Sequence, residues 1–538
     1  MEAGMITIGA LVPATIVLAF IIPLLSLVIK SKTFFHAYAT LVSLIVALVT
    51  TYNLLLIVRE GTQVYAFGGW PPPLGIIYEV DQLNAVLAVL TGWLIFFIVL
   101  YSSWYMKTSN GVEYYYTLIL GLTAGLLGCL YTGDAFNLFV MIEVLSISAY
   151  ALVGFYRGKP QAIEAAIKYG LIGAAATTVY FIALVFLYGS YGTLNMADMA
   201  LKSRTVPYVP YSGSVYGSIS IATLIALALA LWAFTYKSAL FPNHFWLPDA
   251  HPEAPTPVSA ALSGLVVNIG AYASLRFLYT IFGDSSIIAA GVAYRDLFLT
   301  ALLILGIGSG LVGGLMMIVQ RDIKRLLAYS TVSHIGLIFM GISIGFSSVP
   351  LEASALGLSG ALYHIINHSV GKALLFLTSG VLISAAGSRD LDELAGVGRK
   401  YPWVTVALFL GFFQLMGLPP FGGFFSKFLL YSAFFKAGLP IVSAMIVVIS
   451  AISVLGYAKV MYSVWFRPSR DVKDLKGQIS LPTGVITLMG IACLALGLLS
   501  PLLTGFLSGV IDASIMPGGV NNYVQAFLRA ISALTPMG

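Results

Sequence analysis

The sequence predicts an all-α polytopic membrane protein, and two observations carry this prediction. Charged residues make up only 9% of the 538 residues, whereas an ordinary soluble domain has about 25%. Apolar runs of about 20 residues, enough to cross a bilayer as helices, recur along nearly the whole chain. Because so few charges cannot cover a water-facing surface, the composition excludes a soluble enzyme, a disordered protein and a nucleic-acid-binding domain.

We expect about fourteen transmembrane helices from these runs. They cover residues 5–29, 34–57, 82–104, 114–132, 135–156, 163–189, 215–240, 257–282, 296–319, 324–346, 354–386, 402–436, 439–464 and 481–505. The first is too long for a signal-peptide core and has no Lys or Arg before it, so it is interpreted as a retained span. Runs 354–386 and 402–436 exceed the length of a straight span and contain helix breakers. Residues 58–81 are too polar to span and predict a hairpin on one face.

Positive charges predict the orientation of these spans, because cytoplasmic loops carry an excess of Lys and Arg. Fifteen lie on the side of the first loop: Lys30, Lys32, Lys107, Arg157, Lys159, Arg321, Lys324, Arg325, Arg389, Arg399, Lys400, Arg467, Arg470, Lys473 and Lys476. Seven lie on the other side: Arg59, Lys202, Arg204, Arg276, Arg295, Lys436 and Arg529. We therefore place the first group on the cytoplasmic side of the cell membrane and both termini on the outer side.

The remaining five basic residues lie within apolar runs, at Lys168, Lys237, Lys372, Lys427 and Lys459, and Glu143 is the one mid-span acid. A charge at the bilayer centre costs about 3 kcal/mol or more, so such residues indicate function. Lys168 and Lys459 lie near span ends, where an interfacial position is equally reasonable. A deeply buried amine is neutralised by desolvation and charged by an approaching carboxylate, so Lys237 and Glu143 suit proton loading. A fixed structural ion pair is the alternative.

Two stretches of irregular backbone accompany these lysines. FPNHFWLPDAHPEAPTP follows Lys237, and GLPPFGG precedes Lys427. Broken helices within a membrane are tolerated where protein or water satisfies the freed backbone groups, so they mark hydrated cavities and ion sites. Both stretches therefore predict a titratable amine beside such a cavity.

His364, His368 and Lys372 recur at four-residue spacing and predict one stripe along a helix. The two histidines could bind a metal, form structural hydrogen bonds or relay protons; we favour the relay, because small shifts change the charge of histidine near neutral pH. His334 extends the same chemistry. With Glu143, Lys237 and Lys427, these residues form a row over several helices that is typical of a conduit across the bundle.

Other motifs indicate no cofactor, metal or catalytic site. Cys129 and Cys493 lie in separate apolar runs and indicate neither a disulfide framework nor a metal cluster. Gly308, Gly310 and Gly313 fit a dinucleotide fingerprint, but they are mid-membrane and follow no strand. The spacing of Gly306, Gly310 and Gly314 instead predicts close helix packing.

The chain resembles the antiporter-like subunits shared by Mrp-type cation/proton antiporters, membrane-bound hydrogenases and respiratory complex I. The resemblance covers about residues 80–465 and is carried by seven segments in the order of the family: TGDAFNLFVMIEVLSISAYALVG, IEAAIKYGLIGAA, YKSALFPNHFWLPDAHPEAPTPVSAALSG, RDIKRLLAYSTVSHIGLIFMGI, LYHIINHSVGKALLFLTSGVL, SRDLDELAGVGRKYPW and GLPPFGGFFSKFLL.

The resemblance implies two inverted five-helix repeats, at residues 113–282 and 295–465, each with a broken helix. N-terminal spans and the hairpin would occupy residues 1–112, and a loop, the last span and a tail residues 466–538. By similarity, Glu143 pairs with Lys237, the stripe from His364 to Lys372 links the two halves, and Lys427 ends the second half. Lys168 corresponds to another lysine of the family.

Two departures from the family pattern matter. The eighth span offers Ser263 and Asn268 where relatives often carry His or Lys, so a proton path there would use water or neutral side chains. The tail NNYVQAFLRAISAL predicts at most a short amphipathic helix, not the long lateral helix of the largest complex I member. Lys427 in place of a glutamate is typical of the D-type subunit of Mrp antiporters or its hydrogenase counterpart.

The sequence therefore predicts a proton-translocating subunit that works with other membrane subunits in a cation/proton antiporter or a hydrogenase-type complex, with sodium as a possible second ion. No catalytic redox site is expected in this chain. A complex I proton-pumping subunit is the first alternative, and a structural membrane scaffold with static charge pairs is an alternative of another class.

Overall fold

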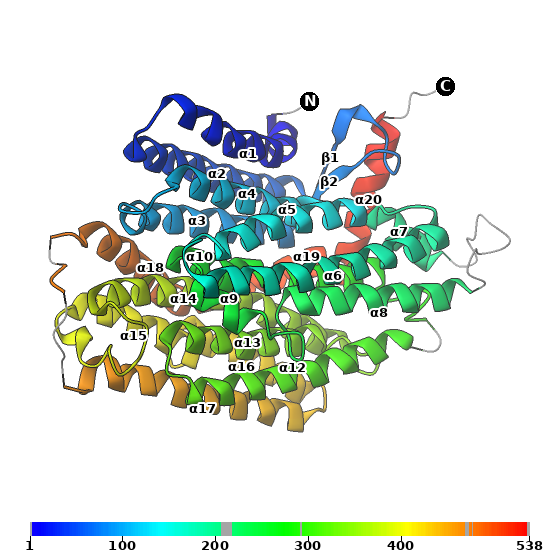
Figure 1. Ribbon diagram of the computed structural model, residues 1–538. Coiled ribbons are helices and arrows are strands. Elements are labelled where there is room, and N and C mark those ends of the chain that lie inside the picture. The colour runs from blue at the N-terminus through cyan, green and yellow to red at the C-terminus, as the bar shows by residue number, and fades with distance from the viewer. Residues whose placement is uncertain (1–2, 206–217, 291–292, 469–472, 476, 535–538) are drawn as a thin grey trace.

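The computed structural model describes residues 3–205, 218–290, 293–468, 473–475 and 477–534, and it is built almost entirely of helices that run side by side (Figure 1). Arg470 and Lys476 of the charge inventory lie outside the described residues. Twelve long helices form the bundle: α1 (Ala3–Val28), α2 (Lys32–Glu60), α3 (Gln82–Tyr105), α4 (Val112–Tyr131), α5 (Ala135–Val153), α6 (Pro160–Tyr191), α8 (Ile219–Lys237), α12 (Tyr294–Val319), α13 (Ile323–Ile342), α14 (Leu351–Ala386), α17 (Pro440–Met461) and α18 (Ser480–Leu498).

Shorter segments complete the bundle. The helices are α7 (Met196–Arg204), α9 (Leu247–Glu253), α10 (Thr256–Ala261), α11 (Asn268–Leu275), α15 (Pro402–Met416), α16 (Gly422–Lys436), α19 (Ser500–Ser514) and α20 (Pro517–Leu534). π-helical segments at Leu262–Val266 and Arg276–Ile281 join α10 and α11 into one continuous, buried span from Thr256 to Ile281, and a third, Tyr462–Phe466, extends α17. Single 3₁₀ turns lie at Phe67–Gly69 and Val397–Arg399.

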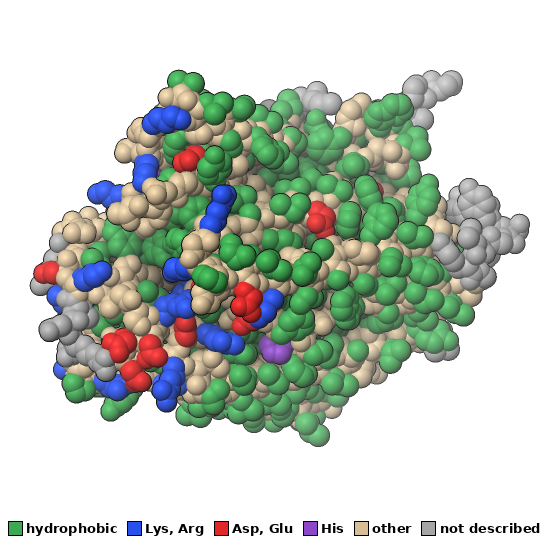
Figure 2. Space-filling model, viewed as in Figure 1, with side chains coloured by type: hydrophobic (Ala, Val, Ile, Leu, Met, Phe, Trp, Pro, Cys, Tyr) green, Lys and Arg blue, Asp and Glu red, His purple; other side chains and the backbone are tan. Residues whose placement is uncertain are grey.

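By length and composition, thirteen of the described helices could cross a membrane, or fourteen when α19 and α20, which meet at a bend of 55°, count as one span. The chain is thus an all-α polytopic membrane protein. Large apolar side chains such as Leu171, Ile441 and Val28 face outward. Figure 2 shows charged side chains gathered toward one end of the visible face, while apolar side chains cover much of the rest.

The predicted hairpin is confirmed. β1 (Gln63–Ala66) and β2 (Ile77–Val80) pair antiparallel, with Gln63 opposite Val80 and Ala66 opposite Ile77. The hairpin packs against the N-terminal half of α1 and against α20, at one end of the bundle (Figure 1). It therefore ties both ends of the chain to the same face of the molecule.

The C-terminal region differs from the sequence prediction. The helix expected over 481–505 ends at Leu498, and Ser500 begins the separate helix α19. The tail expected to be at most a short helix forms α20, which has 18 residues. Its buried side chains Val520, Tyr523, Val524 and Phe527 recur at helical spacing, so the amphipathic pattern noted in the sequence is confirmed over a longer helix that packs on the bundle.

Helical backbone is interrupted beside two of the predicted functional lysines. α8 ends at Lys237, and the next helix begins at Leu247, after a stretch that contains Pro242. α15 ends at Met416, and α16 begins at Gly422. By contrast α14 is continuous over 36 residues, although its length and glycines suggested a break. The inverted-repeat relation and the segment boundaries remain predictions of the sequence.

Glycines allow α12 to pack closely against α13 and α17, as the small-residue spacing predicted. A Cβ on Gly306 would lie 2.9 Å from the carbonyl oxygen of Gly336 on α13. A Cβ on Gly310 would lie 2.5 Å from Ile449 on α17. Gly306 therefore faces α13, and Gly310 faces α17.

Gly336→Ala should destabilise this packing. Its Cβ would lie 2.5 Å from the Gly306 carbonyl oxygen and 2.6 Å from the Gly310 nitrogen, and backbone atoms cannot yield as a flexible side chain does. We expect a loss of about 1–3 kcal/mol, visible as a lower melting temperature of the purified protein in detergent. Gly509→Ala on α19 is the control, since no atom of the described residues outside its own helix backbone and chain neighbours lies within 4 Å of the added Cβ. Equal melting temperatures of the two variants would contradict this account.

Candidate functional site

Two histidines from different helices form the centre of a buried hydrogen-bonded network. His334 on α13 and His364 on α14 lie 3.0 Å apart between Nδ1 and Nε2. The other ring nitrogen of His364 lies 3.0 Å from Ser426 Oγ on α16. Because a neutral imidazole has one N–H and one bare nitrogen, the pair can pass a proton by exchanging tautomers.

The network continues from His334 to Lys372 through two hydroxyls. His334 Nε2 lies 3.0 Å from the Tyr457 hydroxyl on α17, and that hydroxyl hydrogen-bonds to Ser330. Lys372 Nζ donates to Ser330 Oγ and, at 3.0 Å, to the carbonyl oxygen of Leu327. Lys372, Ser330, Tyr457, His334, His364 and Ser426 therefore form an unbroken hydrogen-bonded chain that links four helices.

His368 lies beside this chain without joining it. Its ring centre is 5.7 Å from that of His334, and both of its ring nitrogens are buried with no hydrogen-bond partner in the part of the chain that the structure describes. The spacing of the stripe on α14 is therefore correct, but only His364 and Lys372 are bonded into the chain. His368 fills the space between them.

Lys427, next to Ser426, is held by the end of the preceding helix. Its Nζ donates to the carbonyl oxygens of Leu415 at 2.8 Å and Met416 at 3.0 Å. These carbonyls end α15 and have no helical partner, and the negative end of the helix dipole favours a cation there. Gly417, with φ of 80°, turns the chain away so that the lysine fits.

Lys237 is buried, as expected, but the structure does not bring it into direct contact with Glu143. Its Nζ donates to Ser146 Oγ at 2.6 Å and lies 6.0 Å from the centre of the Tyr169 ring. Glu143 is only half-buried, one helical turn before Ser146, and still interacts electrostatically with Lys237. Among the ion pairs of the described residues, none joins the two. The serine therefore occupies the place that the family resemblance gives to the carboxylate.

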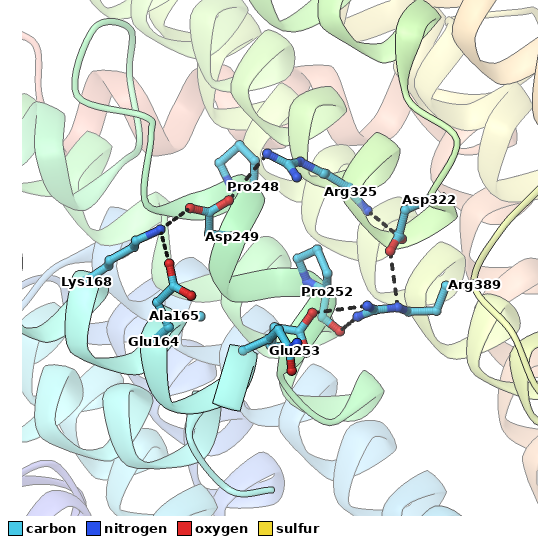
Figure 3. Close-up of a pocket in the computed structure, with 11 residues that line it drawn as sticks. Glu164, Ala165, Lys168, Pro248, Asp249, Pro252, Glu253, Asp322, Arg325 and Arg389 are labelled. Atoms are coloured by element: carbon cyan, nitrogen blue, oxygen red, sulfur yellow. Dashed lines mark hydrogen bonds and ion pairs between the residues drawn. The ribbon is translucent and has the colours of Figure 1, made fainter. Parts of the chain in front are cut away.

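Lys168 lies in a charged cavity at the end of the bundle and not in its centre. Its side chain is half exposed and pairs with Glu164 at 2.7 Å and with Asp249 at 3.5 Å. The cavity has a volume of about 260 Å³, and Arg325 and Arg389 reach into it from the opposite wall (Figure 3). The alternative of an interfacial lysine therefore describes its position better than a mid-membrane site.

The eighth span joins the central helices through neutral side chains. Ser263 Oγ lies 2.7 Å from Thr331 Oγ1 on α13. Asn268 Nδ2 donates to Ser369 Oγ on α14 at 2.9 Å. Neutral polar side chains therefore link this span to α13 and α14, where relatives often carry His or Lys in the span.

The comparisons with known proteins assign the family. The family model described as NADH:quinone oxidoreductase/Mrp antiporter, TM, matches residues 132–453. The chain belongs to this family. This antiporter-like subunit is 33% identical over 477 residues to NADH-quinone oxidoreductase subunit N of Desulforudis audaxviator, which covers 86% of this chain and 89% of the relative.

Two further relatives agree in family and fold. The D subunit of the Na(+)/H(+) antiporter of Alkalihalophilus pseudofirmus is 31% identical over 420 residues, or 78% of this chain and 79% of the relative. A chain of the membrane-bound sulfane sulfur reductase, an archaeal respiratory membrane complex, matches with a TM-score of 0.85 at 25% identity and covers 97% of this subunit and 99% of that chain. The resemblance to antiporter-like subunits is thus confirmed.

The sequence analysis missed several residues of the site. Tyr457, Ser330 and Ser426 carry no signal in the sequence, because a lone hydroxyl in an apolar run is usually structural. Lys324, counted as a cytoplasmic loop charge, is buried and donates to the carbonyl oxygens of Pro252 and Ala254 at the end of α9. Its place after Asp322, at the start of a span, gave no sign of burial.

His251 is the most informative of the missed residues. It is fully buried on α9 and its ring stacks on that of Phe376, with 5.1 Å between the ring centres; among the described residues, neither ring nitrogen has a hydrogen-bond partner. Burial, with the positive charges of Lys324 and Lys372, holds its pKa well below the usual value of 6.5. It therefore stands, neutral, between the charged cavity and the start of the hydrogen-bonded chain. Its position in the proline-rich stretch was the available signal.

The depressed pKa of His251 predicts a pH-dependent stability. Below pH 6.5 the unfolded chain takes up a proton at His251 that the folded chain does not. The free energy of unfolding therefore falls by about 1.4 kcal/mol for each unit of pH below 6.5, until the pH reaches the lower pKa of the folded state. His251→Gln should remove this contribution, so its melting temperature should fall less than that of the wild type between about pH 7.5 and about pH 5. His244→Gln, at a partly exposed position, should change the profile less. Parallel profiles of the wild type and His251→Gln would contradict this assignment.

Proposed function

We propose that this chain is the proton-translocating, antiporter-like subunit of a multi-subunit cation/proton antiporter or hydrogenase-type respiratory complex. The supporting observation is the chain of hydrogen bonds from Lys372 through Tyr457 and the two histidines to Ser426. Each member can both give and receive a proton. A proton that enters at Lys372 can therefore leave at Ser426, beside Lys427, without an ion crossing apolar surroundings.

Access to this path is proposed from the charged cavity around Lys168 and Asp249, with His251 and Lys324 between the cavity and Lys372. In the other half of the subunit, Glu143 and Lys237 form a second proton-loading site through Ser146. The two halves correspond to the predicted inverted repeats at 113–282 and 295–465. His368, beside the histidine pair, would adjust its polarity.

We further propose that the subunit lies in the plasma membrane with the charged cavity toward the cytoplasm and both termini outside. Basic residues such as Arg325 and Arg389 line that cavity, as the positive-inside rule requires. Partners are other membrane subunits, because the named relatives are themselves subunits of larger assemblies. Sodium would pass through this chain or through a partner.

A subunit of a complex I type enzyme is the second candidate. It is favoured by the 33% identity to NADH-quinone oxidoreductase subunit N, slightly above the 31% to the antiporter subunit. The two candidates share the proton path and differ in what drives it. Genes for small Mrp-type membrane proteins beside this one would favour antiport, and genes for iron–sulfur or nickel–iron subunits would favour redox coupling.

Tyr457→Phe should slow proton translocation, because it removes the hydroxyl that joins His334 to Ser330 while keeping the buried ring. We expect a loss of at least about tenfold in the rate of proton uptake by vesicles that hold the whole complex, measured with a pH-sensitive dye. Tyr462→Phe, at an exposed position of the same helical segment, is the matched control. An unchanged rate in Tyr457→Phe would exclude this chain of hydrogen bonds as the path.

Neutralising the other half should separate a transport role from a scaffold role. Lys237→Met and Glu143→Gln should each reduce translocation at least about tenfold while the complex still assembles, because a buried amine costs stability and does not provide it. Lys436→Met, at an exposed ion pair with Glu352, should retain transport. Unchanged pumping in both test variants would refute the proposal, and loss of assembly with normal flux per complex would favour the scaffold.

A further inference from the structure

A second buried charged cluster lies at the end of the bundle that carries the hairpin. Arg276, in the span that starts at Thr256, donates from Nη1 and Nη2 to the two carboxylate oxygens of Asp81, each at 2.7 Å. Both side chains are only 1% exposed. Asp81 also caps α3 by accepting from the Asn84 backbone at 3.2 Å. The pair is thus electrically balanced and fixed by its own hydrogen bonds.

Two tyrosines enclose the Arg276 guanidinium. Its central carbon lies 5.3 Å from the ring centre of Tyr272 and 5.2 Å from that of Tyr523 on α20. Its Nε donates to the Tyr272 hydroxyl at 3.0 Å. The charge therefore joins the eighth span, the start of α3 and the C-terminal helix in one contact.

Glu79, on strand β2, is the unbalanced member of this cluster. Its side chain is fully buried, and within the described part of the chain neither carboxylate oxygen has a hydrogen-bond partner that meets the geometric criteria. Arg276 and Asp81 act on it electrostatically with opposite signs, and the Tyr523 hydroxyl also interacts with it. Burial, partly offset by Arg276, raises its pKa well above the usual value.

The backbone fixes Glu79 in this position. Glu79 pairs with Val64 in the hairpin, and its backbone carbonyl oxygen accepts a hydrogen bond from Asn84 Nδ2 at 2.9 Å. An ionised carboxylate without a partner in such surroundings is strongly disfavoured, so the group is held protonated while Arg276 remains on Asp81. Because the backbone of Glu79 is held by the hairpin, the guanidinium of Arg276 is the nearby charge whose position can alter this balance.

A cavity lies beside the cluster. It has a volume of about 260 Å³ and is lined by Gln82, the neighbour of Asp81, and by Asn522, the neighbour of Tyr523, together with Thr62 and Arg529. A proton that leaves Glu79 would enter this space past Asp81 or Tyr523.

We propose that Glu79 is a reversible proton-binding site on the hairpin face of the subunit, and that the Arg276–Asp81 pair is the charge that switches it. When the guanidinium turns from Asp81 toward Glu79, the O–H bond of the carboxyl breaks, the proton passes to water in the neighbouring cavity, and Arg276 compensates the new carboxylate. When it returns, Glu79 takes up a proton again. A role of Glu79 in proton translocation rests on the proposed function. The protonation of its carboxyl group does not.

Infrared spectroscopy of the purified protein tests the protonation directly. Wild-type protein at neutral pH should show the C=O stretch of a buried protonated carboxyl, Glu79→Gln should lose that band, and Glu79→Asp should shift it. Glu60→Gln, an exposed glutamate before the same hairpin, should leave the spectrum unchanged. An identical band in the wild type and Glu79→Gln would overturn the proposal, whatever the transport assays show.

Flux measurements test the role of the site. In vesicles with the whole complex, Glu79→Gln should slow proton translocation at least about tenfold, and Glu79→Asp should retain most of it. Normal flux in Glu79→Gln with the infrared band lost would overturn the role in translocation. If wild-type vesicles moved no protons, the proposed function would fail, while the infrared result would still decide whether Glu79 holds a proton.

Discussion

Buried lysines in this subunit are satisfied by backbone carbonyls and hydroxyls instead of carboxylates, and this constraint organises the interior. Four buried lysines share it, Lys237, Lys324, Lys372 and Lys427, and the partly buried Lys459 follows the same pattern. Among the ion pairs of the described residues, none contains any of the five. An amine can donate hydrogen bonds to a carbonyl in both its neutral and its charged form, whereas a tight ion pair would fix the charge, and the proposed proton transfer requires this property.

Helix ends supply most of those carbonyls. Lys427 binds the end of α15, Lys324 the end of α9, and Lys459 the carbonyl oxygens of Ile318 and Gln320 at the end of α12. The last carbonyls of a helix have no partner within it and carry the negative end of its dipole. The helix ends therefore place carbonyl oxygens without helical partners beside the lysines, and the lysines in turn satisfy these backbone groups.

Arg276 and Asp81 show the contrasting solution. Their bidentate pair is electrically balanced and flanked by two aromatic rings, and it joins the hairpin face to the C-terminal helix. A guanidinium cannot be deprotonated in a protein, so it can act on a neighbouring acid only by moving. The molecule thus combines hydrogen-bonded titratable groups along the central chain with a guanidinium–carboxylate pair near its hairpin face.

The sequence by itself determined that this protein is embedded in a membrane. It also determined the approximate extent of most spans, the hairpin, the family and the four-residue spacing of His364, His368 and Lys372 on α14. These features depend on composition and on spacing along one helix, which are local properties of the chain. It could not identify Tyr457, Ser330 and Ser426, the direct partner of Lys237, or the burial of His251 and Glu79. Only the tertiary structure decided these, because a hydroxyl or a carboxyl gains its role from which other helix it meets, and that meeting is fixed by packing between distant segments.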